Sequence, residues 1–137
     1  MAIAKWATPS ARSANFASTT LNSLANLGES TAVTYDNSTN RDLYGIITIK
    51  LGSITPSTGG SITVRVTIND GTDTADRIGG DQYVIPLTTT SSAKIAVVNM
   101  ARLYPYSMRI SVINNAGVAF AASGNELYIR PWNEDIA

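Results

Sequence analysis

Apolar and polar residues alternate with a period of two along most of the chain after residue 30. In residues 43–51, one face collects the apolar positions Leu43, Gly45, Ile47, Ile49 and Leu51. In residues 61–69, one face collects Ile62, Val64, Val66 and Ile68, and the other collects Ser61, Thr63, Arg65 and Thr67. This alternation is typical of antiparallel strands that bury one face and expose the other.

Shorter segments of the same kind complete the pattern. They cover residues 31–35, 82–88, 94–99, 107–113, 117–121 and 126–130. Residues 52–60, with Pro56 and a Gly-Gly pair, are typical of a hairpin loop, and residues 114–117 of a tight hairpin turn. Pro86 predicts an edge strand or a bulge, because proline donates no ladder hydrogen bond. About eight short strands without a long helix predict an all-β, antiparallel β-sandwich that is jelly-roll-like.

The first part of the chain lacks the alternation. Residues 1–29 are rich in Ala, Ser, Thr and Asn, with scattered apolar residues such as Trp6, Phe16 and Leu24. We expect an extended N-terminal arm that leads into the first strand, with room for a brief helical turn. Residues 30–137 then form the jelly-roll-like β-sandwich domain. Ordering an arm costs about 1–2 kcal/mol per residue, so we expect exposed anchors such as Trp6 and Phe16 to bind a partner.

Composition narrows the function. The 137 residues carry ten basic and ten acidic side chains, which gives a formal net charge of zero and no basic field for nucleic acid. Cysteine and histidine are absent, so the commonest metal ligand, the commonest general base and every thiol nucleophile are missing. No apolar run approaches the ~20 residues of a membrane helix, and the start does not resemble a signal peptide. We therefore expect no enzyme, no cofactor, no nucleic acid and no membrane, and synthesis in a cytoplasm.

One stretch of the sequence is a candidate metal site. Residues 69–81 contain four carboxylates that could gather oxygen ligands around Ca²⁺, at Asp70, Asp73, Asp76 and Asp81. Their spacing does not match an EF-hand loop, and Asn-Asp-Gly is a strong turn former. The favoured interpretation is a solvated loop, with no metal assigned.

The sequence offers two other kinds of candidate site, a catalytic site and a sugar-binding face. Serines and carboxylates occur without a recognisable catalytic motif, and most acids lie at expected strand ends. Six tyrosines could line a sugar-binding face or pack against a neighbouring subunit, where tyrosine is enriched: Tyr35, Tyr44, Tyr83, Tyr104, Tyr106 and Tyr128. The subunit contact is the favoured interpretation.

Three segments of the sequence resemble those of a known protein family. They are Leu21-Asn-Ser-Leu-Ala-Asn26, the run Asp36-Asn-Ser-Thr-Asn40 leading into Asp42-Leu-Tyr-Gly-Ile-Ile, and the ending Leu127-Tyr-Ile-Arg-Pro-Trp-Asn-Glu134. The chain resembles the capsid decoration, or cement, proteins of tailed bacteriophages, over most of its length. The resemblance implies a jelly-roll-like sandwich on the outer surface of an icosahedral virion. It implies the major capsid protein and further copies of the chain as partners, and it brings no catalytic residues.

From these observations we expect a structural protein that binds the outer capsid surface and stabilises contacts between major capsid proteins. A trimer is the first expectation for self-association and a dimer the second. The residues expected to contact partners are Lys5, Trp6, Arg12, Phe16 and Trp132. Two alternatives stay open: another virion β-sandwich from a tail or baseplate, and a carbohydrate-binding module.

Overall fold

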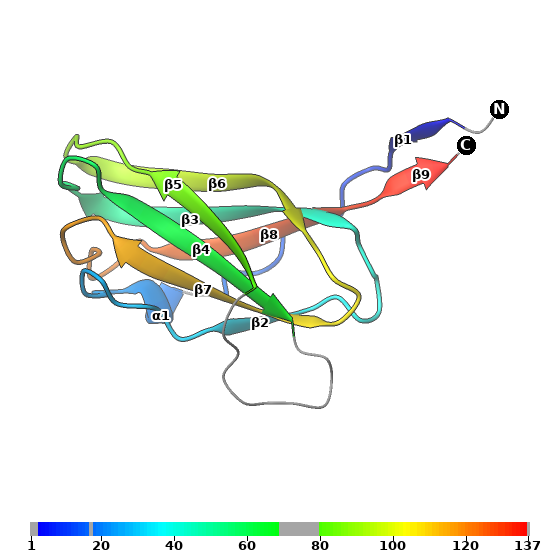
Figure 1. The fold of residues 1–137 in the computed structure, drawn as a ribbon, viewed down its shortest axis with the longest axis horizontal. Helices are drawn as coiled ribbons and strands as arrows, with labels where there is room; N and C mark the ends of the chain where they lie inside the picture. The colour runs from blue at the N-terminus through cyan, green and yellow to red at the C-terminus, as the bar shows by residue number, and fades with distance from the viewer. Residues whose placement is uncertain (1–2, 17, 69–79, 137) are drawn as a thin grey trace.

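The computed structural model describes residues 3–16, 18–68 and 80–136. These residues form an all-β sandwich with a single short helix, which confirms the predicted fold class (Figure 1). In chain order the elements are β1 Ala4–Trp6, α1 Ser18–Leu21, β2 Val33–Asp36, β3 Tyr44–Ile54, β4 Ser61–Ile68, β5 Asp81–Pro86, β6 Ser92–Arg102, β7 Ser107–Asn115, β8 Glu126–Trp132 and β9 Glu134–Ile136.

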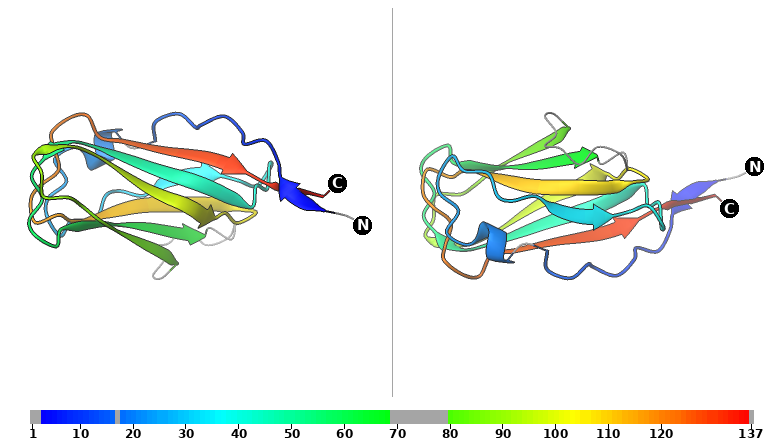
Figure 2. Two further views of the ribbon diagram at one scale, coloured as in Figure 1. Left: turned by 90° about the horizontal axis from the view of Figure 1, so that it is seen from above. Right: turned by 90° about the horizontal axis from the view of Figure 1, so that it is seen from below.

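The sandwich has two antiparallel sheets that face each other (Figure 2). One has the strand order β2-β7-β4-β5 and the other has the order β6-β3-β8. Apart from β4 and β5, neighbours within a sheet are far apart along the chain, so most connections cross from one sheet to the other. The jelly-roll topology stays a prediction, which this nested order favours.

The core lies between the two sheets and is filled by the alternating apolar positions. Ile47, Ile49 and Leu51 of β3 are almost fully buried, as are Ile62 and Val64 of β4. The inward faces predicted for these two strands are therefore confirmed. Thr63 and Thr67, which the alternation placed outward, are also buried, since β4 is flanked on both sides by β5 and β7.

The first predicted strand is present with shifted bounds, since it runs from Val33 to Asp36. Three local predictions are wrong. Residues 117–121 are irregular and not a strand, because Phe120 N–H donates to Leu24 O in the lead-in segment and not to a neighbouring strand. The loops at 52–60 and 114–117 are not hairpins, because each joins strands of different sheets. The edge position inferred from Pro86 is confirmed, since β5 is the outer strand of its sheet.

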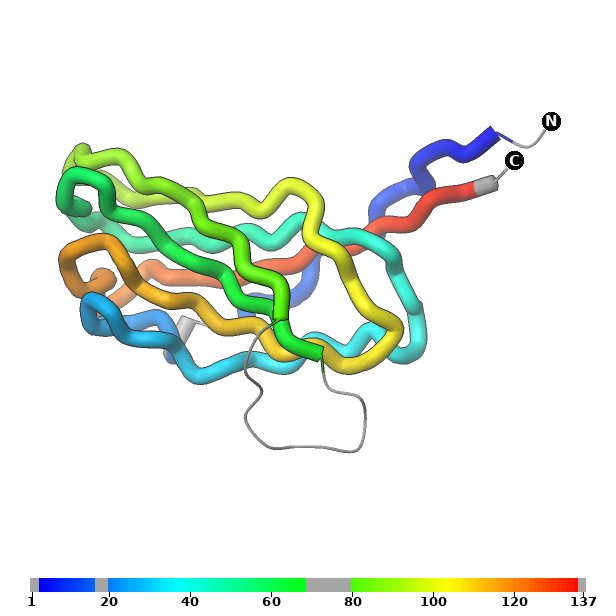
Figure 3. Tube along the Cα trace, viewed as in Figure 1, coloured from blue at the N-terminus to red at the C-terminus, as the bar shows by residue number. Residues whose placement is uncertain are grey.

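The two ends of the chain meet in a separate ribbon. Strands β1 and β9 pair antiparallel, with Lys5 opposite Asp135 and Trp6 opposite Glu134. This two-stranded ribbon projects from one end of the sandwich along its long axis (Figures 1 and 3). The description of residues 1–29 as one arm is thus refined, because part of this region is a strand of the ribbon and Ser18–Leu21 is a helical turn.

Candidate protein-docking surface

Between the ribbon and α1, the chain runs beside the outer edge of β8 (Figure 2). Four N–H groups of this segment donate to β8 or to the residue after it: Ala7 to Asn133 O, Ser10 to Pro131 O, Ser13 to Ile129 O and Phe16 to Leu127 O, at 2.8–3.0 Å. The donors are three residues apart along the segment, whereas their acceptors are two residues apart along β8 and its continuation. This mismatch prevents a regular ladder, so the segment is extended without being a strand.

Side chains supply the return bonds that a regular strand would make with its carbonyls. Ile129 N–H donates to Ser13 Oγ at 3.0 Å, and Leu127 N–H donates to Asn15 Oδ1 at 3.1 Å. The Arg12 guanidinium lies over the Tyr128 ring, 3.7 Å from its centroid. Polar side chains and one cation–π contact therefore hold the segment against β8, which protects that sheet edge from pairing with other chains.

Three aromatic rings gather where the ribbon leaves the sandwich. The Trp6 ring is 6.1 Å from the rings of Tyr44 and Trp132, with interplanar angles of 79° and 76°. The Tyr44 and Trp132 rings are 5.9 Å apart and tilted by 30°. Edge-to-face contacts of this kind each contribute about 0.5–1.5 kcal/mol beyond burial. We call these three residues the aromatic cluster.

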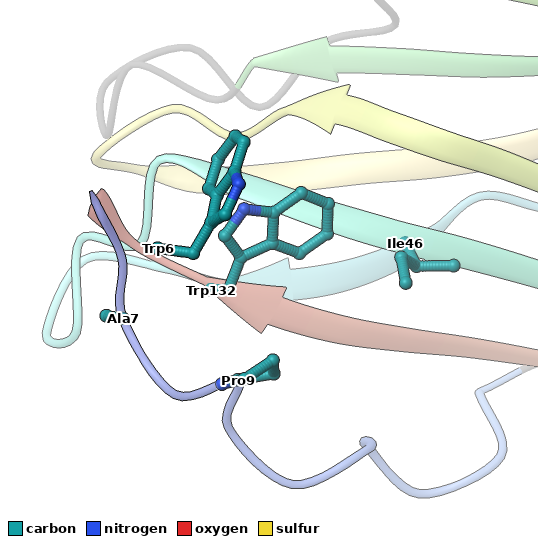
Figure 4. Close-up of a pocket in the computed structure, with 5 residues that line it drawn as sticks. All are labelled: Trp6, Ala7, Pro9, Ile46 and Trp132. Carbon is teal, nitrogen blue, oxygen red and sulfur yellow. The ribbon is translucent and has the colours of Figure 1, made fainter. Parts of the chain in front are cut away.

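Beside the aromatic cluster lies an open hollow of about 330 Å³. It is lined by Trp6, Ala7, Pro9, Ile46 and Trp132 (Figure 4). Trp6 remains 59% exposed, so the rings cover one another only in part. Because all the lining side chains are apolar, the hollow fits an apolar group of a partner better than a charged one.

The aromatic cluster continues onto the outer face of the β6-β3-β8 sheet. Ile95 and Val97 of β6 are exposed there and lie opposite Lys50 and Thr48 of β3. Ile46, two residues before Thr48, faces the same side. Ile95 is 69% exposed, which is unusual for a side chain of this size. We call this sheet face, together with the aromatic cluster, the apolar face.

The outer face of the other sheet is more polar. Arg65 of β4 forms an ion pair with Glu29 at 2.6 Å, and Ser111 Oγ donates to the same carboxylate at 2.6 Å. Here the largest exposed apolar side chain is Val84 of the edge strand β5. The apolar face also carries an ion pair, between Lys50 and Glu126 at 3.2 Å, so the aromatic cluster and the exposed Ile95 and Val97 are what distinguish it. These side chains make it the better candidate for contact with another protein.

A polar network fixes the base of the ribbon. Asn133, between β8 and β9, donates from Nδ2 to Asp42 Oδ1 at 2.9 Å and accepts from Leu43 N–H at 2.7 Å through Oδ1. The buried Asn37 donates to Asp42 O and to Tyr104 O, both at 2.8 Å. These bonds tie the start of β3 and the loop after β6 to the point where the ribbon begins.

The five partner-binding residues predicted from the sequence lie in three different places. Lys5, Trp6 and Trp132 lie on the ribbon or in the aromatic cluster, and Lys5 and Trp6 are exposed. Arg12 is exposed and lies over Tyr128. Phe16 is not an exposed anchor, because it is half-buried against the core and contacts Tyr35 edge-on. Sequence reasoning missed Ile46, Ile95 and Val97, although their outward positions in alternating strands were visible.

The predicted acidic loop lies mostly outside the described residues, which include neither Asp70, Asp73 nor Asp76. Asp81 begins β5, and its Oδ2 accepts a hydrogen bond from Tyr104 Oη at 3.0 Å. In the described part of the chain, no group of three or more acidic side chains could hold a metal ion. That part also contains no helix with the length and apolar character needed to span a membrane.

Several hydrogen bonds shift the pKa values of surface groups. The bond to Asp81 raises the pKa of Tyr104, because ionising the phenol would break it. The hydroxyl of Tyr128 donates to Glu126 at 2.6 Å, which lowers the pKa of that carboxyl and raises the pKa of the phenol. Burial raises the pKa values of Tyr35 and Tyr83. Tyr35, Tyr83 and Tyr128 come from β2, β5 and β8, and Tyr104 comes from the loop after β6.

Comparison with known proteins adds no family assignment. No protein-family model, curated protein or solved structure matches this chain.

Proposed function

We propose that this chain is a structural virion protein that binds the outer surface of a tailed-phage capsid and stabilises contacts between major capsid proteins. The observation that carries the proposal is the difference between the two outer faces of the sandwich. Both faces carry an ion pair, Lys50–Glu126 on one and Arg65–Glu29 on the other, but only the first combines the exposed Ile95 and Val97 with a half-open aromatic cluster. The sequence resemblance to decoration proteins supplies the identity of the partner.

The apolar face suits attachment to a repeating protein lattice. Apolar and aromatic side chains are the residues that dominate the buried centres of protein interfaces. A contact of modest strength becomes effective when many copies bind one assembled shell. We therefore infer that the apolar face lies against the capsid and that the polar face points to solvent.

A sedimentation assay with assembled capsids and with free capsid subunits tests the proposal. The chain is expected to pellet with the assembled shells and to leave the free subunits unbound, because the binding surface spans neighbouring capsid proteins. Equal affinity for both forms would count against a role in stabilising the shell.

Two edge-strand variants provide a matched pair for the same assay. Ile95 on β6 and Val84 on β5 are 69% and 66% exposed, on opposite faces of the sandwich. Ile95→Asp is expected to weaken capsid binding by about tenfold or more, since a charge would be placed in an apolar contact. Val84→Asp is expected to leave binding within about twofold. The reverse order would show that the other face meets the capsid.

A further inference from the structure

The ribbon formed by β1 and β9 carries its charges unequally. Its β1 strand has one charged residue, the basic Lys5, and its β9 strand has the acidic Glu134 and Asp135. In the described residues, β1 pairs only with β9, so each strand keeps one outer edge without a partner. The ribbon therefore has a basic edge on one side and an acidic edge on the other.

The ribbon is also too small to be stable by itself. Two strands of three residues each bury little surface, and isolated two-stranded ribbons are marginal in water. The Lys5–Asp135 ion pair is long, at 4.0 Å, and both side chains are more than half exposed. Such a pair contributes little to holding the ribbon together.

Backbone groups on both outer edges remain available. Ala7 N–H donates to Asn133 O, and hydrogen-bonded and non-bonded pairs alternate in an antiparallel ladder. By this alternation the N–H and C=O of Lys5 point toward Asp135, and those of Ala4 and Trp6 point to the outer edge of β1. On β9, the corresponding outward groups belong to Glu134 and Ile136.

We propose that the ribbon joins copies of this chain head to tail, with β1 of one copy pairing antiparallel with β9 of the next. In this arrangement Lys5 lies between Asp135 of its own chain and Asp135 of the neighbouring copy, so that opposite charges alternate across the joined ribbons. Pairing β1 with β1, or β9 with β9, would instead place like charges side by side. The charges therefore select unlike edges.

The geometry of the ribbon agrees with a closed ring. Head-to-tail contacts form rings when the rotation between copies closes, and a ring leaves no outer strand edge unpaired. Because the ribbon projects along the long axis of the molecule (Figure 1), a ring built from ribbons places all sandwiches on the same side of it. Pairing of like edges by a two-fold axis would place two sandwiches at opposite ends. Three copies, the number expected from the sequence, would give a ring of six strands.

This inference goes beyond the proposed capsid role and does not depend on it. It is tested by sedimentation equilibrium of the purified chain without capsids. The unaltered chain is expected to form a cyclic oligomer, and Lys5→Ala is expected to raise its dissociation constant by about threefold to fivefold, the effect of losing one exposed charge pair. Lys50→Ala is the control, because Lys50 also forms a solvent-accessible ion pair, with Glu126, but this half-buried pair lies on the sheet and not on the ribbon. It is expected to leave the dissociation constant within about twofold.

Charge reversal separates contacts between copies from contacts within one chain. Lys5→Glu and Asp135→Lys each break the charge match, so each variant alone is expected to be monomeric. Mixed together, the two variants are expected to associate in alternation, because each β1 edge of one then matches the β9 edge of the other. Alternation closes only rings with an even number of copies, so the mixture is expected to give pairs or even-numbered assemblies in place of a ring of three. Each chain in the mixture still lacks its internal Lys5–Asp135 pair, so internal stabilisation cannot explain a rescue.

Cross-linking reports which edges meet. The chain contains no cysteine, so Ala4→Cys and Ile136→Cys each introduce a single thiol. A short bismaleimide is expected to join the two variants to each other and to give little product from either alone. Abundant Ala4→Cys homodimers, tighter association of Lys5→Ala, or a chain that stays monomeric at millimolar concentration would each overturn the proposal.

Discussion

Asn114 lies near the end of β7, and its side chain is fully buried. Its Nδ2 donates to Leu24 O at 2.9 Å and to Val118 O at 2.8 Å, and its Oδ1 accepts from Ala116 N–H at 2.9 Å. One side chain thus joins the lead-in segment, the end of β7 and the loop that follows. The side chain of the next residue, Asn115, is only half-buried, and among the described residues it donates one long hydrogen bond, of 3.5 Å, to Thr63 Oγ1.

The cost of Asn114→Ala follows from these three bonds. Each contributes about 1 kcal/mol net, and each backbone group left without a partner adds to the loss where water cannot reach it. We therefore expect a loss of about 3–4 kcal/mol in the free energy of unfolding. With an unfolding entropy of about 2.1 cal/mol/K per residue, a chain of 137 residues would melt about 10–14 °C lower. Asn115→Ala is expected to cost less than about 0.5 kcal/mol.

Urea denaturation followed by tryptophan fluorescence and circular dichroism measures both variants. The midpoint should fall for Asn114→Ala while the slope with denaturant stays constant, which indicates an unchanged folded state. Asn114→Asp should be at least as damaging, because a carboxylate cannot donate to the two carbonyls. Equal stability of Asn114→Ala and Asn115→Ala would refute the assignment of Asn114 as the tie between these segments.

Three further predictions concern other parts of the sandwich. Gly52→Ala is expected to lower the free energy of unfolding by more than about 2 kcal/mol, because the added Cβ would lie 2.2 Å from a backbone oxygen. Gly59→Ala has open space around the added Cβ but a φ of 77°, so it should cost about 1 kcal/mol; thermal melts measure both variants. The bond to Asp81 raises the pKa of Tyr104 in the folded state, so the stability that this bond contributes is complete below pH 10 and is lost as the pH rises through the folded-state pKa. In alkaline unfolding experiments, Tyr104→Phe should therefore lose less stability with rising pH than the unaltered chain. Deletion of residues 1–17 removes the segment that covers the edge of β8, so calorimetry should show a cooperative unfolding transition at a lower temperature. A non-cooperative transition would show instead that this segment belongs to the core.

The alternation of apolar residues was sufficient to predict the strands that build the core. It works for β3 and β4 because each has one face against the opposite sheet, so the inward positions are fixed by burial. It fails for the segment beside β8, whose three-to-two match with that strand has no period of two. A segment held by side chains such as Ser13 and Asn15 leaves no apolar pattern in the sequence.

The candidate site was harder to predict, because it depends on residues that are distant in the chain. The sequence predicts both Trp6 and Trp132 as partner-binding residues, but it does not predict their contact with each other, because 126 positions separate them. Turn-forming residues also indicate where a strand ends without indicating which sheet the next strand joins. For this reason the turn-forming residues at 114–117 predict a hairpin, although this segment connects the two sheets.

The measurement that tests the proposed capsid role most directly is cryo-electron microscopy of tailed-phage particles to which the purified chain has been added. We expect density for the sandwich on the outer surface of the head, across the junction between neighbouring capsid proteins. The face with Ile95 and Val97 should lie against the shell, and the Arg65–Glu29 ion pair should face solvent. Density in the tail or baseplate, or contact with the capsid through the polar face alone, would contradict it.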